Sequence, residues 1–216
     1  MRYELIVFDW DGTLMNSVPK IVACMQAAAL DAEWGALSVS AIEDIVGLGL
    51  PEAIVKLCPG IQPVQAELLR QRYAHHFVYS DTTPMPFFEG VEAQLVRLRQ
   101  REQQRLAVAT GKSRRGLDRV FAETGSGEWF HASRTADETR SKPHPQMLSE
   151  LLEELAIPVE RAVMVGDSEY DMEMARAIGM DRVAVTYGVH TPSRLAVSQP
   201  RWVAHTTSEL FDWLYG

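Results

Sequence analysis

Short apolar runs alternate with longer segments of helical periodicity along most of the chain. Residues Tyr3–Phe8 (YELIVF) are mostly apolar and end directly at a polar turn, which is typical of a buried strand. Similar runs predict further strands at Arg105–Ala109, Ala162–Val165, Arg182–Thr186 and, more weakly, Trp202–Ala204. The segments between them predict helices at Val91–Arg101, Ser113–Glu123, Gln146–Ala156 and Glu169–Ile178. Strands that alternate with helices of this length favour right-handed β-α-β units and a parallel sheet.

The segment from residue 17 to residue 79 interrupts this alternation, because it contains no convincing strand pattern. It predicts helices at Pro19–Leu30, Ser40–Ile45, Glu52–Leu57 and Val64–Tyr79. Glycine and proline turns separate these helices, and the proline-containing stretch Asp81–Phe88 leads back to the alternating region. We therefore expect an α/β core domain of residues 1–15 and 84–216, with a helical cap domain of residues 16–83 inserted after the first strand.

Composition and charge narrow the class of protein. A chain of 216 residues with 46% hydrophobic and 23% charged residues is typical of a globular protein with its own core. The 21 basic and 29 acidic residues give a net charge of −8, which argues against nucleic acid as a partner. No apolar stretch approaches the ~20 residues that span a bilayer. Glu4 and Asp9 also interrupt any signal-peptide pattern, so we expect a cytoplasmic protein with no membrane contact.

Polar side chains follow the predicted strands at several places. Asp9 and Asp11 come directly after the first strand, and two carboxylates so close together are costly without a cation. Thr110 and Gly111 follow the next strand, where a hydroxyl and backbone amides at the start of a helix can bind an anion. Each pattern alone also has a plain structural interpretation, an Asp-Gly turn in the first case and a helix N-cap in the second.

Two further signals lie toward the C-terminus. Lys142 stands in the segment SKPHP, which by itself is also typical of a rigid loop with a solvated lysine. Asp167 follows a buried strand and Asp171 lies one helical turn later, a pattern that an acidic helix start would share. Because ligands bind beyond the carboxyl ends of parallel strands, the common placement of these signals favours a single site. Carboxylates for Mg²⁺, together with hydroxyl, amide and ammonium groups for phosphate oxygens, indicate phosphoryl transfer.

In this order and at these spacings, the motifs resemble those of the haloacid dehalogenase superfamily of phosphohydrolases. They are FDWDGTL at 8–14, ATGK at 109–112, KP at 142–143, and GD at 166–167 followed by Asp171. The resemblance covers essentially the whole chain and implies a doubly wound, Rossmann-like α/β core with an inserted helical cap. It also implies Mg²⁺ as the cofactor and a small phosphorylated metabolite as the partner.

The resemblance further implies a role for each matched residue. Asp9 is expected to be the nucleophile that forms an aspartyl-phosphate, and Asp11 the acid and base for the leaving oxygen and the water. The phosphoryl group is expected to be held by Thr110, the Gly111 amide and Lys142, which offsets negative charge. The expected Mg²⁺ ligands are Asp9, the backbone carbonyl of Asp11, Asp167, and Asp171 in a second layer or through water.

Asp11 and the cap indicate which subgroup of the superfamily the chain resembles. Asp11 favours a phosphate ester, since the dehalogenases of this superfamily lack an acid at that position. The cap and its turn Val46–Pro51 resemble the phosphoglycolate phosphatase and β-phosphoglucomutase group, whose caps close over small substrates. The leading hypothesis is a phosphatase similar to phosphoglycolate phosphatase. A phosphosugar mutase is the alternative, and a non-enzymatic phospho-receiver module is disfavoured because receivers lack a helical insert. Monomer and homodimer both stay open.

Overall fold

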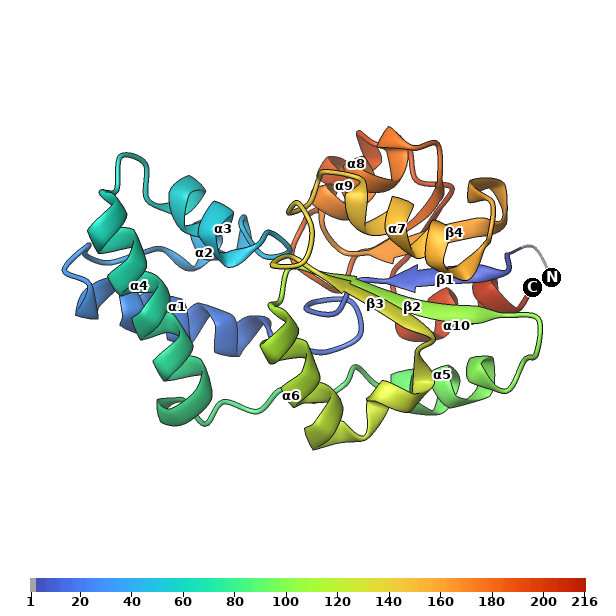
Figure 1. Ribbon diagram of the computed structural model, residues 1–216, viewed down its shortest axis with the longest axis horizontal. Coiled ribbons are helices and arrows are strands. Elements are labelled where there is room, and N and C mark those ends of the chain that lie inside the picture. Colours follow the sequence, from blue (N-terminus) through green and yellow to red (C-terminus); the bar gives the residue numbers. More distant parts are fainter. Residues whose placement is uncertain (1–2) are drawn as a thin grey trace.

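Six parallel strands form one sheet in the computed structural model, which describes residues 3–216 (Figure 1). The strands are β1 (Leu5–Phe8), β2 (Arg105–Thr110), β3 (Ala132–Thr135), β4 (Ala162–Gly166), β5 (Asp181–Val185) and β6 (Trp202–Ala204). Their order across the sheet is β3-β2-β1-β4-β5-β6, so the first strand of the chain is central. The chain proceeds outward from β1 first on one side and then on the other, which confirms the doubly wound α/β fold.

The side chains of β1 alternate between two hydrophobic clusters, one on each face of the sheet. Ile6 and Phe8 belong to one cluster, and Leu5 and Val7 to the other. The first cluster is completed by α5 (Val91–Arg99), α6 (Arg114–Thr124) and α10 (Thr207–Tyr215). The second is completed by α7 (Gln146–Leu155) and α8 (Glu169–Ala177). Burial on both faces explains why this strand is an unbroken apolar run.

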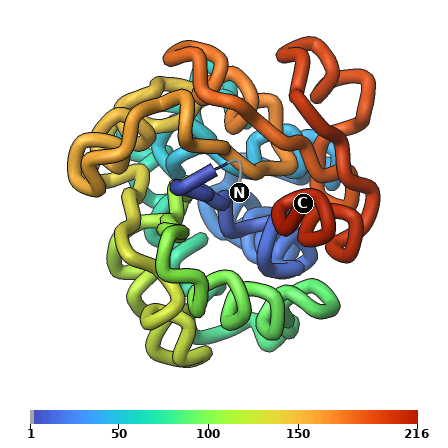
Figure 2. The backbone as a smooth tube through the Cα atoms, turned by 90° about the vertical axis from the view of Figure 1, so that its right-hand side faces the viewer, coloured from blue at the N-terminus to red at the C-terminus, as the bar shows by residue number. Residues whose placement is uncertain are grey.

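The last helix returns to the first strand (Figure 2). The rings of Phe8 and Phe211 lie 6.5 Å apart between centroids, and those of Tyr3 and Trp213 lie 5.7 Å apart. Aromatic pairs at these separations add to the burial of the rings. The C-terminal helix α10 therefore helps to hold the strand that precedes Asp9.

The helices of the segment after β1 pack around a third hydrophobic cluster of their own. They are α1 (Val18–Asp31), α2 (Val39–Glu43), α3 (Leu50–Leu57), α4 (Pro63–His75) and the π-helical segment η1 (His76–Ser80). Met25, Ile42, Ile54 and Leu69 are buried in that cluster. Figure 1 shows these helices beyond the carboxyl ends of the strands. This separate hydrophobic core is consistent with an inserted cap domain, although its expected boundaries, residues 16–83, stay a prediction.

Some elements differ from the sequence-based expectations. The strand β3 was not expected, because its sequence ASRT is polar and three of its four residues are only half-buried. The expected helix Val64–Tyr79 is α4 followed by the π-helical turn η1. Unexpected short elements are α9 (Pro192–Ala196), η2 (Ser126–Trp129) and η3 (Val159–Arg161), and α10 was also missed. None of the helices in residues 3–216 has the length and apolar character needed to cross a membrane.

Candidate active site

The sheet register brings three of the four polar signals to one edge. Phe8 pairs with Val108 of β2 and with Val165 of β4, so the ends of these three strands lie side by side. Asp9 follows β1 directly, Thr110 ends β2, and Asp167 follows β4. All three side chains are buried. The site therefore forms where the central strand meets its two neighbours, as expected for an open parallel sheet.

Three buried carboxylates form its centre. One oxygen from each of Asp9, Asp167 and Asp171 lies within 4.8 Å of the others. Burial raises the pKa of Asp9 well above its ordinary value, with Asp171 and Asp167 adding to the effect against the lowering by Lys142. Burial, followed by the charge of Asp171, raises the pKa of Asp167 to about 7. These shifts indicate a cluster that carries more negative charge than its surroundings neutralise.

Lys142 is the cation of this cluster. Its Nζ lies 2.8 Å from Asp9 Oδ1 and 2.6 Å from Asp171 Oδ1, and its side chain is completely buried. Burial acts to lower the pKa of Lys142, but Asp171 and Asp9 together raise it above the ordinary value. The ammonium group therefore stays charged, and it offsets one of the three carboxylates.

Asp171 is also tied into the start of α8. Ser168 is the N-cap, and its backbone N and Oγ donate to Asp171 Oδ2 at 3.1 and 2.6 Å. This capping box satisfies one oxygen, while Lys142 satisfies the other. Both oxygens of Asp171 are thus occupied, which agrees with the expected place of this residue behind the other metal ligands. That placement stays a prediction.

Asp167 lies in a cradle made by two glycines. A Cβ on Gly12 or on Gly188 would lie 2.2 Å from Asp167 Oδ2, so neither position has room for a side chain. Thr13 Oγ1 donates to Asp167 Oδ1 at 2.8 Å, and the backbone N of Val189 donates to Oδ2 at 2.9 Å. These contacts orient the Asp167 carboxylate toward Asp9.

The residues present fit a divalent cation. Asp9 is buried, and neither of its oxygens has a hydrogen bond of good geometry within residues 3–216, although Lys142 is close. Lys142 pairs with Oδ1, so Oδ2 has no partner within residues 3–216, and a buried carboxylate that also faces two further carboxylates is costly to ionise. Oxygen ligands of this kind are those that Mg²⁺ prefers. The structure thus contains an acidic site suited to a metal, and the identity of the metal stays a prediction.

The carboxylate of Asp11 lies outside this group. It forms an ion pair with Lys112, whose Nζ is 2.9 Å from Asp11 Oδ1, and Ser17 Oγ donates to the same oxygen. The three carboxylates that lie together therefore do not include that of Asp11, whose expected metal contact is its backbone carbonyl. The physical reason is the nearby lysine and hydroxyl, which attract this carboxylate away from the crowded centre. A metal contact through the Asp11 backbone carbonyl stays a prediction.

The ATGK motif connects the sheet to the cap. Thr110 is fully buried, and its Oγ1 accepts a hydrogen bond from the Lys112 backbone N at 3.2 Å. A Cβ on Gly111 would lie 2.5 Å from the carbonyl oxygen of Leu48 and 2.6 Å from that of Gly47. The glycine is therefore required for close approach to the cap turn, which brings the cap against the ATGK motif.

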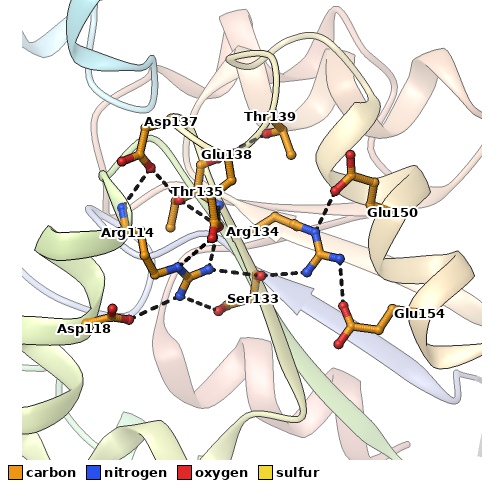
Figure 3. Close-up of polar contacts among 10 residues, drawn as sticks. All are labelled: Arg114, Asp118, Ser133, Arg134, Thr135, Asp137, Glu138, Thr139, Glu150 and Glu154. Atoms are coloured by element: carbon orange, nitrogen blue, oxygen red, sulfur yellow. Dashed lines mark hydrogen bonds and ion pairs between the residues drawn. The ribbon is translucent and has the colours of Figure 1, made fainter.

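A network of charged groups holds the loop beside this motif (Figure 3). Arg114 donates two hydrogen bonds to Glu138, at 3.0 and 2.6 Å, and its backbone N donates to Asp137 at 2.8 Å. Arg134 on β3 pairs with Glu150 and Glu154 of α7. The start of α6, the loop after β3 and α7 are thus held together on one side of the site.

Several residues of the site were given no role in the sequence analysis. Thr13, Ser17 and Lys112 lie within or next to the recognised motifs, so their positions were a signal that could have been used. Ser168 follows Asp167 and its capping box is visible as the pattern Ser-x-x-Asp. Gly188 is different, because only the folded chain brings it to Asp167.

The fold and the site define a class of protein: a doubly wound α/β core whose acidic cluster lies at the strand ends beneath a helical cap. Residues 6–185 match the family described as haloacid dehalogenase-like hydrolase. This match covers most of the chain, so the protein belongs to that family, and the resemblance in the motifs is confirmed.

Similar curated proteins carry phosphatase names. The protein named "Probable phosphatase IndB" from Dickeya dadantii (strain 3937) is 30% identical over 210 residues, covering 95% of this chain and 91% of that protein. A phosphoglycolate phosphatase from Vibrio cholerae is 29% identical, and the match covers 97% of this chain and 96% of that protein.

Solved structures share the whole fold. A hydrolase from Pseudomonas syringae has a TM-score of 0.86 at 22% identity, covering 98% of both chains. A structure described as a predicted phosphoglycolate phosphatase, from Haemophilus somnus 129pt, also has a TM-score of 0.86 at 22% identity and covers 99% of both chains. These similarities concern the fold, cap included.

Proposed function

We propose that this protein is a Mg²⁺-dependent phosphatase that hydrolyses a small phosphorylated metabolite through an aspartyl-phosphate on Asp9. The observation that carries this proposal is the state of Asp9: a buried carboxylate without a hydrogen bond of good geometry in residues 3–216, beside Lys142 and two further carboxylates. A carboxylate that is desolvated and aimed into a charged site is suited to nucleophilic attack. The phosphatase names of the relatives support the same reaction.

The first chemical step transfers the phosphoryl group to the protein. An Asp9 oxygen forms a bond to phosphorus while the bond from phosphorus to the ester oxygen breaks. Asp11 gives a proton to that leaving oxygen, which departs as an alcohol. Asp11 is suited to this role because Lys112 and Ser17 hold its side chain apart from the acidic centre.

The second step restores Asp9. Asp11, now a carboxylate, takes a proton from a water molecule whose oxygen attacks phosphorus. The bond between Asp9 and phosphorus breaks, and inorganic phosphate leaves. During both steps the phosphoryl oxygens accept hydrogen bonds from the Thr110 hydroxyl and the Gly111 amide, and Lys142 balances their charge.

The metal would be held by Asp9, Asp167 and the backbone carbonyl of Asp11. When bound, Mg²⁺ neutralises charge on the phosphoryl group and brings it within reach of Asp9. Asp171 orients Lys142 and is itself fixed by Ser168, so its contribution is indirect. Thr13 and the backbone N of Val189 fix the Asp167 carboxylate, which would be one of the metal ligands.

The cap limits the substrate to a small molecule, because its turn at Gly47 and Leu48 packs directly against Gly111. Phosphoglycolate is the substrate expected to rank high, since many relatives carry that name. Large phosphoproteins would not pass beneath the cap. A cytoplasmic location also stays a prediction, and monomer and homodimer are both open.

A panel of phosphorylated metabolites, assayed for released phosphate with and without Mg²⁺, tests this proposal. We expect phosphoglycolate or a small sugar phosphate to give the highest kcat/KM, and excess chelator to abolish turnover. Full activity in chelator would contradict the metal assignment. Isomerisation of β-phosphoglucose with its bisphosphate, without free phosphate, would identify the mutase instead. Stable phosphorylation of Asp9 without turnover would identify a receiver.

A further inference from the structure

Asp11 is held through one of its two oxygens. Lys112 Nζ lies 2.9 Å from Asp11 Oδ1, and Ser17 Oγ donates a hydrogen bond to the same atom. The side chains of Lys112 and Asp11 are only 9% and 11% exposed, so this ion pair is largely shielded from solvent. A shielded pair of this kind orients a carboxylate far better than a surface pair does.

Lys112 is itself held by four sets of contacts. Its backbone N donates to Thr110 Oγ1, and its carbonyl accepts from the backbone N of Ala136 at 3.0 Å. The Arg114 network of Figure 3 fixes the chain just beyond it. The ammonium group of Lys112 lies 5.3 Å from the centre of the Phe77 ring, and Phe77 belongs to η1 of the cap. Lys112, the last residue of the ATGK motif, thus contacts Thr110, the cap and Asp11 together.

We propose that Lys112 is a positioning residue that orients Asp11 as the acid for the leaving group. This inference rests on the proposed function, because it assigns a supporting group to that reaction. With both donors on Oδ1, the transferable proton of Asp11 belongs on Oδ2. As the bond from phosphorus to the ester oxygen breaks, that proton moves to the departing oxygen and leaves an alcohol and a carboxylate. The carboxylate then remains paired with Lys112.

The contact with Phe77 links this arrangement to the cap. Phe77 lies in a π-helical turn, an element often found at functional positions. Because the ammonium group lies 5.3 Å from the ring centre, the cap contributes one of the contacts that hold Lys112 beside Asp11.

Dependence on the leaving group distinguishes this role from a structural one. An alkyl phosphate needs protonation of its oxygen, whereas 4-nitrophenyl phosphate has a leaving group that departs as a stable anion. The experiment compares Lys112→Met with the wild type on the best alkyl phosphate of the panel and on 4-nitrophenyl phosphate. The value measured is kcat/KM, which reports formation of the aspartyl-phosphate. We expect a loss of about 10²-fold on the alkyl ester and less than about 5-fold on the aryl ester.

Lys20 offers a matched control. Its Nζ also lies 5.3 Å from the Phe77 ring and its side chain is 10% exposed, but it donates to the backbone carbonyl of Asp81 at 2.7 Å. We expect Lys20→Met to change kcat/KM by the same factor for both substrates. An equal loss on both substrates for Lys112→Met, or no loss, would overturn the positioning role.

Asp11→Asn separates this inference from the proposed function. If Asp11→Asn shows the leaving-group dependence and Lys112→Met does not, only the role of Lys112 fails. If Asp11→Asn affects both esters equally, or if the wild type hydrolyses neither, the acid assignment fails and the inference fails with it. The double variant Asp11→Asn with Lys112→Met should have nearly the same kcat/KM as Asp11→Asn alone, because both changes remove the same function. If Lys112→Met does not fold, Lys112→Gln replaces it in the same comparison. Lys112→Arg keeps the positive charge and should retain more kcat/KM on the alkyl ester than Lys112→Met.

Discussion

At the scale of single residues, the site is a cluster of charges that the protein alone does not neutralise. Asp9, Asp167 and Asp171 face each other in a buried space, and Lys142 is the cation between two of them. Burial is the largest cause of the raised pKa values of Asp9 and Asp167, and the neighbouring carboxylates raise them further. Such a cluster is destabilising without a bound cation, and this arrangement is typical of a functional site.

The raised pKa of Asp167 predicts that the free energy of unfolding of the metal-free protein depends on pH. The pKa rises from an ordinary 3.8 to about 7, so ionisation in the folded state is unfavourable and stability is lost as the pH rises across that window. Asp167→Asn removes the ionisation. We expect its stability relative to the wild type, measured by urea unfolding in chelator, to increase between pH 5 and 7 by a few kcal/mol, since one pKa unit corresponds to about 1.4 kcal/mol. A pH-independent difference would contradict the shift.

Removal of the proposed nucleophile, Asp9, should abolish activity without reducing stability. Asp9→Asn is expected to abolish phosphate release while the fold survives, because the amide keeps the shape of the side chain but cannot attack phosphorus. In chelator its Tm should equal or exceed that of the wild type, since one buried charge is removed. Phosphate release and thermal unfolding are measured on the same preparation. Wild-type turnover by the variant would contradict the assignment of Asp9.

At the scale of elements, the site depends on three strand ends and on turns that come close to them. The register of β1 with β2 and β4 aligns Asp9, Thr110 and Asp167. Glycines then allow neighbouring segments to approach: Gly188 approaches Asp167, and Gly111 approaches the cap turn. These positions set the geometry of the site without supplying any chemistry of their own.

The contact between Gly111 and the cap turn can be tested by Gly111→Ala, which adds one methyl group. In Gly111→Ala the new Cβ would lie 2.5 Å from the Leu48 carbonyl oxygen, so the cap turn must move away. We expect kcat/KM to fall at least about 10-fold and the free energy of unfolding to fall by about 1–3 kcal/mol. The control is Gly116→Ala in α6, whose Cβ would come no closer than 3.3 Å to Ser113 Oγ. That change should be neutral or stabilising by about 0.5–1 kcal/mol. Wild-type kcat/KM in Gly111→Ala would contradict the close contact.

At the scale of the whole molecule, a polar network joins the cap to the core. Arg194 pairs with Asp44 of the cap and with Glu169 of α8. The Tyr170 hydroxyl donates to the Asp44 carbonyl at 2.5 Å, and Lys56 of α3 donates to that hydroxyl at 2.5 Å. These groups are partly exposed, so we expect them to bias the position of the cap more than they stabilise the fold.

Arg194→Met tests this distinction between cap position and stability. We expect the free energy of unfolding to change by less than about 1 kcal/mol, because the ion pairs are partly exposed. KM should rise several-fold while kcat changes less, because a cap with fewer contacts closes less readily. Arg201→Met is the control, since Arg201 pairs with Asp181 within the core. An unchanged KM, or the same rise in both variants, would contradict a role of this network in closure.

Much of the site could be predicted from the sequence because its residues lie in short motifs after apolar strands. Asp9, Thr110, Lys142 and Asp167 all lie at the expected edge. The side chain of Asp11 could not be placed, because its direction depends on Lys112, which is distant in the chain. The strand β3 was missed for a different reason: its polar, half-buried residues carry little hydrophobic signal.

The sequence by itself determined the parallel sheet, the helical insert after the first strand and the acidic and basic groups of the site. This follows because apolar periodicity and short motifs are local properties of the chain. The tertiary structure decided which of these groups meet. It placed three carboxylates together and the fourth beside Lys112, and it brought Gly188 and the cap turn into contact with the site. Such contacts depend on sheet register and on packing between distant segments, and no local pattern records them.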